Sequence, residues 1–293
     1  MHFLSKSKFV KIIFTLLCVV LGVILPEHFL VPIAILNVLT IGVIHGSNDL
    51  FILSKTLTTS KNTPFAFLFF SYTLFVLIMV LALNRVPQWA LLLFVSASAF
   101  HFGEQQWHNS SYVNTAKLNM FYGAYGTFLF SLLFYTHANQ TTEIIYDIAN
   151  LLITEDFLWS LLILSGILLL IASLVNFNQI KEQLFFQLVI LLVLILLFSQ
   201  TSLVWSFSVY FVLWHSIPSL REQANVLFPY SKTPILAYMR HALLYWIMAM
   251  VGFGFISFFC TDNTTSLLAL FFSFLAAITI PHVVVIFWMH KKK

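Results

Sequence analysis

The sequence has few charged residues. Only 8% of its 293 residues are Asp, Glu, Lys or Arg, whereas soluble domains carry roughly 25%. Hydrophobic residues make up 60% of the chain, and the mean hydropathy is +0.96. A soluble domain cannot bury that much apolar surface, so we predict an all-α, polytopic integral membrane protein.

Cysteine and clustered basic residues are also scarce. Cys18 and Cys260 are too few for a disulfide framework, and their spacing matches no zinc motif. The lysines and arginines are scattered between apolar runs, which excludes a nucleic-acid-binding face. The chain also lacks the HExxH motif of intramembrane zinc proteases and the clustered histidine boxes of membrane desaturases.

Apolar runs long enough to cross a bilayer occur about ten times, because a transmembrane helix needs ~20 mostly apolar residues. The predicted segments are 9–26, 29–52, 65–84, 87–107, 118–137, 157–175, 183–199, 201–221, 235–259 and 266–289. The break between 183–199 and 201–221 is the weakest, and one long bent helix is the alternative there. We predict a single transmembrane helical domain over residues 1–293.

The distribution of charge predicts the orientation of these segments. If the N-terminus is cytoplasmic, alternation leaves only Arg85, of the 14 Lys and Arg residues, on the outer side. The acidic residues Glu143, Asp147, Glu155, Asp156 and Asp262 fall outside. Cytoplasmic loops carry an excess of Lys and Arg, so we expect both termini in the cytoplasm and a multi-pass protein of the cell inner (plasma) membrane.

Four histidines occupy similar positions in four of the predicted segments: His45, His101, His215 and His282. Each lies about 14–16 residues from the outer start of its segment, a depth of ~20–24 Å at ~1.5 Å per residue. Neutral imidazole is a good ligand for iron, copper, zinc and nickel. We therefore predict that the four imidazoles bind one metal ion; hydrogen-bonded histidines between helices are the alternative.

Polar and aromatic neighbours accompany these histidines. Asp49 follows His45 by four residues, on the same face of the expected helix, and Glu104 follows His101 by three. We expect both carboxylates to contact ligand imidazoles, and Trp214 to lie beside His215. Solvation near the helix end is the alternative for the two carboxylates, and an ordinary interfacial aromatic is the alternative for Trp214. The aromatic content of 17% suits either a tunnel for an apolar ligand or a surface that faces lipid.

The histidine motifs resemble those of a known family. His45-Gly46-Ser47-Asn48-Asp49 fits H-G-x-x-D, His101-Phe102-Gly103 fits H-F-G, Trp214-His215-Ser216 fits W-H-S, and Pro281-His282 fits P-H. Together, from about residue 40 to 285, they resemble the Brp/Blh family of membrane β-carotene 15,15'-dioxygenases. The resemblance implies an Fe(2+) centre with His45, His101 and His215 as ligands, and cleavage of β-carotene by O2 to two retinals.

One position departs from the family pattern. The W-H-S histidine is often followed, four positions later, by a second histidine, and here that residue is Ser219. We expect His282 to replace it as the fourth ligand and Ser219 to lie next to the ligands. A site with three histidines is the alternative.

The resemblance also implies partners. β-Carotene would enter sideways from the lipid bilayer, retinal would pass to a rhodopsin, and no protein acid or base is expected. Two other functions fit membrane histidines. A cytochrome-b-like haem protein would leave two of the four histidines unexplained, and a histidine-lined transporter would spread ionisable groups through the depth of the membrane.

Overall fold

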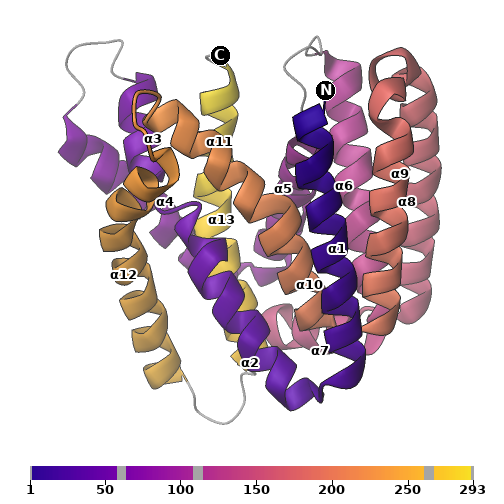
Figure 1. The fold of residues 1–293 in the computed structure, drawn as a ribbon. Coiled ribbons are helices and arrows are strands. Elements are labelled where there is room, and N and C mark those ends of the chain that lie inside the picture. Colours follow the sequence, from indigo (N-terminus) through magenta and orange to yellow (C-terminus); the bar gives the residue numbers. More distant parts are fainter. Residues whose placement is uncertain (1, 58–63, 108–114, 261–266, 292–293) are drawn as a thin grey trace. The chain divides into compact units, whose positions relative to one another are not determined.

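The computed structural model of the chain describes residues 2–57, 64–107, 115–260 and 267–291, and all regular structure in these ranges is helical (Figure 1). The prediction of an all-α protein is therefore confirmed for this part of the chain. Lys61 and Asp262, which the charge argument placed on opposite sides of the membrane, lie outside the described residues.

Proline and threonine begin many of the helices. Pro87 and Pro234 are first residues of helices, where the missing N–H costs nothing. Thr115 and Thr154 cap two others by accepting backbone N–H bonds of 3.2 Å. The helices are α1 His2–Ile24, α2 Glu27–Asn37, η1 Val38–Gly42, α3 Asp49–Leu57, α4 Phe65–Arg85, α5 Pro87–Trp107, α6 Ala116–Thr136, α7 Ala138–Ala149, α8 Glu155–Val175, α9 Phe177–Gln200, α10 Leu203–Tyr210, η2 Phe211–Ser216, α11 Ile217–Leu227, α12 Pro234–Cys260 and α13 Leu267–Lys291, where η marks a π-helix.

The described residues pack as two compact units, each assembled from separate stretches of the chain. Unit 1 comprises Met1–Val38, Ala99–Thr142 and Ile153–Ser216, and unit 2 comprises Leu39–Ser98, Glu143–Leu152 and Ile217–Lys293. Within unit 1, α6 packs on α8, α1 on α9 and α10 on α2. Within unit 2, α13 packs on α3 and α4, and α11 packs on α12. A single domain over the whole chain stays a prediction.

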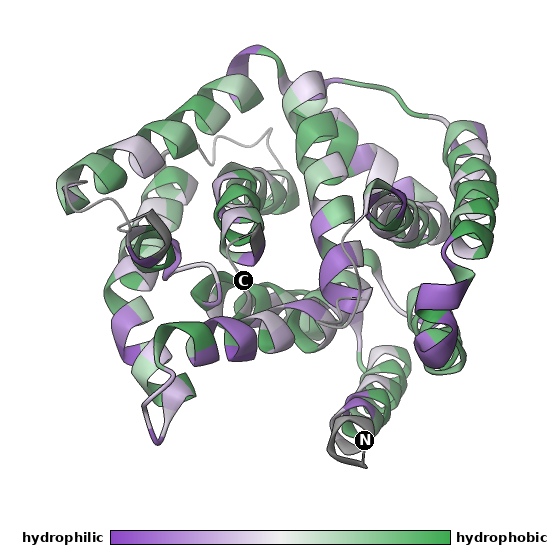
Figure 2. Cartoon of the chain, turned by 90° about the horizontal axis from the view of Figure 1, so that it is seen from above, coloured by the Kyte–Doolittle hydropathy of each residue, from purple (hydrophilic) through white to green (hydrophobic). Residues whose placement is uncertain are grey.

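Seven helical stretches in the described residues are long and apolar enough to cross a membrane: 7–24, 65–85, 155–175, 177–200, 203–227, 234–258 and 267–290. Each overlaps one of the predicted segments. Hydrophobic residues dominate along the helices (Figure 2), and large ones such as Phe70 and Leu170 are about two-thirds exposed, as lipid contact requires. These helices support a polytopic membrane protein, while ten spans and cytoplasmic termini stay predictions.

The predicted segments 87–107 and 118–137 are also helices, but they are more polar than the seven stretches above. α5 and α6 each have 21 residues, but they include polar side chains such as Ser98 and His101, which are buried. Much of α6 is buried, including Tyr122 and Tyr125. α6 lies within unit 1, whereas α5 belongs to unit 2 up to Ser98 and to unit 1 from Ala99. The polar residues of both helices lower their hydropathy.

The predicted segment 29–52 is not one helix. After α2 and η1 the chain makes a turn at His45–Asn48, and α3 begins at Asp49. Gly46, Ser47 and Asn48 have low helix propensity, which explains the break. The prediction that His45 and Asp49 share one helix face is therefore wrong.

Candidate functional site

Unit 1 brings His101 and His215 together. His101 lies on α5 and His215 on η2, and their ring centroids are 4.8 Å apart at an interplanar angle of 78°. Both are almost fully buried, at 1% and 2% exposure. Phe102 stacks on His215 with its centroid at 4.2 Å, and Phe211 lies 5.4 Å away. The aromatic rings restrict the orientation of the His215 imidazole.

The π-helical turn around His215 was not predicted. In η2 the Ser216 hydroxyl donates to the Phe211 carbonyl, five residues earlier, at 2.9 Å. Isolated π-helical turns inside helices are rare and are frequently found at functional sites. The widened turn sets the direction in which His215 leaves the backbone.

Unit 2 brings His45 and His282 together with nearly the same geometry. Their ring centroids are 4.9 Å apart at 87°, and both side chains are buried. His45 lies in the turn before α3, and its Nδ1 donates to the Gly42 carbonyl. His282 lies on α13 directly after Pro281, which interrupts the helical hydrogen bonding there.

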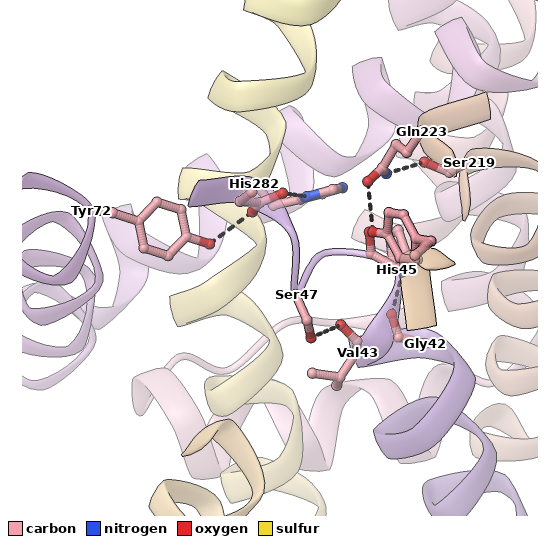
Figure 3. A network of polar contacts seen from close by, with 10 residues as sticks. Gly42, Val43, His45, Ser47, Tyr72, Ser219, Gln223 and His282 are labelled. Atoms are coloured by element: carbon pink, nitrogen blue, oxygen red, sulfur yellow. Dashed lines mark hydrogen bonds and ion pairs between the residues drawn. The ribbon is translucent and has the colours of Figure 1, made fainter. Parts of the chain in front are cut away.

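Asp49 contacts the imidazole of His282, although it follows His45 in the sequence. His282 Nδ1 donates to Asp49 Oδ1 at 2.8 Å, and the Tyr72 hydroxyl donates to Asp49 Oδ2 at 2.8 Å (Figure 3). The turn at Gly46 lets the carboxylate at the start of α3 reach α13. Asp49 therefore contacts one of the predicted ligand imidazoles, and its role beside a metal stays a prediction.

A second polar chain connects Ser219 to the turn that carries His45 (Figure 3). Gln223 Nε2 donates to Ser219 Oγ at 2.9 Å, and the Tyr238 hydroxyl lies 2.8 Å from Gln223 Oε1. The same hydroxyl donates to the His45 carbonyl, and Asn48 Nδ2 donates to the Tyr238 carbonyl at 3.0 Å. All of these side chains are buried, so the network fixes the backbone of the turn.

Sequence reasoning missed Tyr72, Gln223 and Tyr238. Gln223 follows Ser219 by four residues on α11, a spacing that indicates a shared helix face. The two tyrosines lie within apolar runs and carry no signal of their own.

Trp214 and Glu104 were predicted to lie next to the ligands. The Trp214 indole donates to Thr15 Oγ1 at 3.0 Å, and Lys11 Nζ lies 4.6 Å from its ring centroid. Trp214 therefore anchors η2 to α1. Glu104 is half-buried on α5, three residues after His101. Their roles beside a metal stay predictions.

The donor set suits a metal such as ferrous iron. Each of the four histidines has a buried ring nitrogen: Nε2 of His45, His101 and His282, and Nδ1 of His215. The centroid separations of 4.8 and 4.9 Å are those of ordinary edge-to-face ring contacts.

The histidines occur as pairs, one in each unit. No group of three or more His, Cys, Asp or Glu side chains that could hold a metal ion is found among the residues that the structure describes. That both pairs bind the same ion is therefore a prediction.

Comparison with known proteins gives one match. A protein-family model described as Beta-carotene 15,15'-dioxygenase matches residues 36–290, a range that includes all four histidines. No curated protein and no solved structure matches the chain.

Proposed function

Because the chain belongs to the beta-carotene 15,15'-dioxygenase family, we propose that it cleaves the central double bond of β-carotene with O2 and releases two retinals. We also propose that the reaction depends on Fe(2+) bound by His45, His101, His215 and His282. The observation that carries the proposal is the family match over most of the chain, which includes the two buried histidine pairs.

The hydrogen bonds in unit 2 prepare two of the imidazoles to act as ligands. His45 and His282 each donate a proton from Nδ1, to Gly42 and Asp49 respectively. An imidazole that donates from one nitrogen keeps a lone pair on the other, and in both residues that nitrogen is Nε2. When bound, ferrous iron would supply the unpaired electrons through which O2 can react with a closed-shell polyene.

The reaction requires no protein acid or base. One carbon–carbon double bond breaks, two carbon–oxygen double bonds form, and each product receives one oxygen atom of O2, so no proton is gained or lost. Asp49, Tyr72 and Gln223 are then needed only to orient other groups, which agrees with their places in hydrogen-bond networks.

The substrate and the membrane suit each other. β-Carotene has no hydrogen-bonding group and is dissolved in the bilayer, so an apolar helical protein can receive it sideways from lipid. We place the protein in the inner (plasma) membrane and propose that retinal leaves through lipid, where a rhodopsin could take it up.

The first test is expression in a bacterium that makes β-carotene. We expect loss of orange colour and two retinals per β-carotene consumed, with O2 required. Removal of metal from the purified protein with a chelator should stop the reaction, and Fe(2+) but not Zn(2+) should restore it. Persistent β-carotene beside well-expressed, iron-loaded protein would contradict the proposal, and a Soret band would favour a haem protein.

The second test changes each histidine separately to alanine. Replacing His45, His101, His215 or His282 should lower both bound iron and retinal formation at least about tenfold, since loss of even an outer contact typically costs that much. His241→Ala is the matched control, because this exposed histidine stacks on Phe51 at 5.0 Å and belongs to neither pair. If His282→Ala keeps its full iron content and full activity, the iron site consists of the other three histidines.

A further inference from the structure

We propose that Tyr72, Asp49 and His282 form a positioning relay that keeps His282 protonated on Nδ1 and so leaves Nε2 to bind the metal. The inference deepens the proposed function, because it assigns residues that prepare one ligand of the proposed iron site. Tyr72 and Asp49 act through His282, so they are positioning residues.

Three features of its surroundings act on the Asp49 side chain. Asp49 is the first residue of α3, where the helix dipole favours negative charge. It accepts the Tyr72 hydroxyl on one oxygen and His282 Nδ1 on the other, both at 2.8 Å. With 2% exposure, an ionised Asp49 needs these partners, because a buried charge without them is strongly unfavourable.

A buried carboxylate determines which nitrogen of its histidine carries the proton. A carboxylate oxygen accepts, so the hydrogen bond at 2.8 Å requires a proton on His282 Nδ1. The lone pair of the neutral ring is then on Nε2, which is buried. A carboxylate bound to the second nitrogen also raises the basicity of a metal-binding imidazole.

Tyr72 limits how the carboxylate can move. Its hydroxyl comes from α4, which packs on both α3 and α13. With one oxygen fixed by Tyr72, the other stays directed at His282. Loss of the hydroxyl would leave Oδ2 without this donor and free the carboxylate to rotate away from the imidazole.

The direct test compares Tyr72→Phe and Asp49→Asn with the control Tyr125→Phe. Tyr125 is buried in unit 1 against Trp107 and Phe121, so its change removes the same atom from a tyrosine that takes no part in the relay. Titration of metal-free protein with Co(2+), followed by its visible absorption, should show affinity about tenfold weaker for Tyr72→Phe and up to about 100-fold weaker for Asp49→Asn. Tyr125→Phe should bind like the wild type.

A second measurement needs neither metal nor activity. Nitrogen-15 NMR of histidine-labelled, metal-free protein, with His282 assigned by the His282→Ala spectrum, should show a proton on Nδ1 in the wild type. Both relay variants should shift His282 towards the Nε2-protonated form, and Tyr125→Phe should not.

Three results would overturn the relay. These are a wild-type His282 protonated on Nε2, unchanged Co(2+) affinity in both relay variants, and a lower melting temperature in Tyr72→Phe as its only effect. If the wild type binds no metal and forms no retinal, the proposed function fails, and the NMR measurement still decides whether the relay exists.

Discussion

At the scale of single residues, Gly46 leaves the space in which the His282 imidazole lies. A Cβ atom at position 46 would lie 3.2 Å from His282 Nδ1, which is tighter than an ordinary contact. No glycine in the described part of the chain has a positive φ, so alanine suits the backbone and its effect would be steric. We expect Gly46→Ala to displace His282 and to lower iron affinity and retinal formation by about three- to tenfold, since small misplacements at a site are costly.

The matched control for Gly46→Ala is Gly252→Ala, because a Cβ at Gly252 meets nothing within 4 Å. Both variants are measured for iron content and for the rate of retinal formation at equal protein. If Gly46→Ala keeps the wild-type iron content and rate, the His282 ring can shift without loss of iron binding or activity. Contact at position 46 then does not limit the geometry of this ligand.

The four histidines could be selected from the sequence as candidates, but the residues that contact them could not. His45, His101, His215 and His282 stand out because imidazole in an apolar run is unusual. Tyr72 and Tyr238 are ordinary residues in such runs, and they reach their partners across 23 and 193 positions of the chain. Contacts of this kind depend on how helices pack, which local patterns do not contain.

At the scale of elements, α5 and α6 approach so closely in unit 1 that only glycine fits at two places. A Cβ at Gly103 would lie 2.0 Å from the Tyr122 carbonyl oxygen, and one at Gly126 would lie 1.7 Å from the Ala99 carbonyl oxygen. Small residues allow this approach between membrane helices. Since His101 is two residues from each of Ala99 and Gly103, the contact also fixes the height and direction of His101.

We predict that Gly126→Ala forces α5 and α6 apart. The clash is with backbone, so neither helix can relieve it by a change of rotamer, and we expect a loss of at least about 1–3 kcal/mol in the free energy of unfolding. Iron content should fall with it. Gly123→Ala is the control, because its Cβ would lie 4.0 Å from the Phe100 ring. Denaturant unfolding in detergent measures both, and equal stabilities would refute the close approach.

Helices were easier to predict than their interruptions. The apolar runs gave the seven long membrane helices, because one such helix needs only length and composition. The turn at His45–Asn48 has a local cause in Gly46, Ser47 and Asn48, and it could have been predicted. The π-helical segments η1 and η2 have no comparable signal, since ordinary apolar residues form most of both.

At the scale of the whole molecule, the orientation in the membrane is a prediction from charge. Three apolar helices, α8, α9 and the stretch 203–227, separate Leu152 from Tyr230, so these residues should lie on opposite sides. The predicted topology puts Leu152 outside and Tyr230 in the cytoplasm. Between His28 and Asn84 it predicts two crossings, by 29–52 and 65–84, which puts both residues outside.

Single cysteines at these four exposed positions test the prediction in a background with Cys18 and Cys260 changed to alanine. A maleimide that cannot cross membranes should label His28→Cys, Asn84→Cys and Leu152→Cys in intact cells, and Tyr230→Cys only after permeabilisation. Residues 29–52 contain a turn, so the first two variants examine directly whether this segment crosses the membrane. Labelling of His28→Cys and Asn84→Cys from opposite sides would mean that 29–52 returns to the side it entered. His45 would then not lie at the membrane depth predicted for His101, His215 and His282. The topology would no longer support the binding of one iron ion by all four histidines.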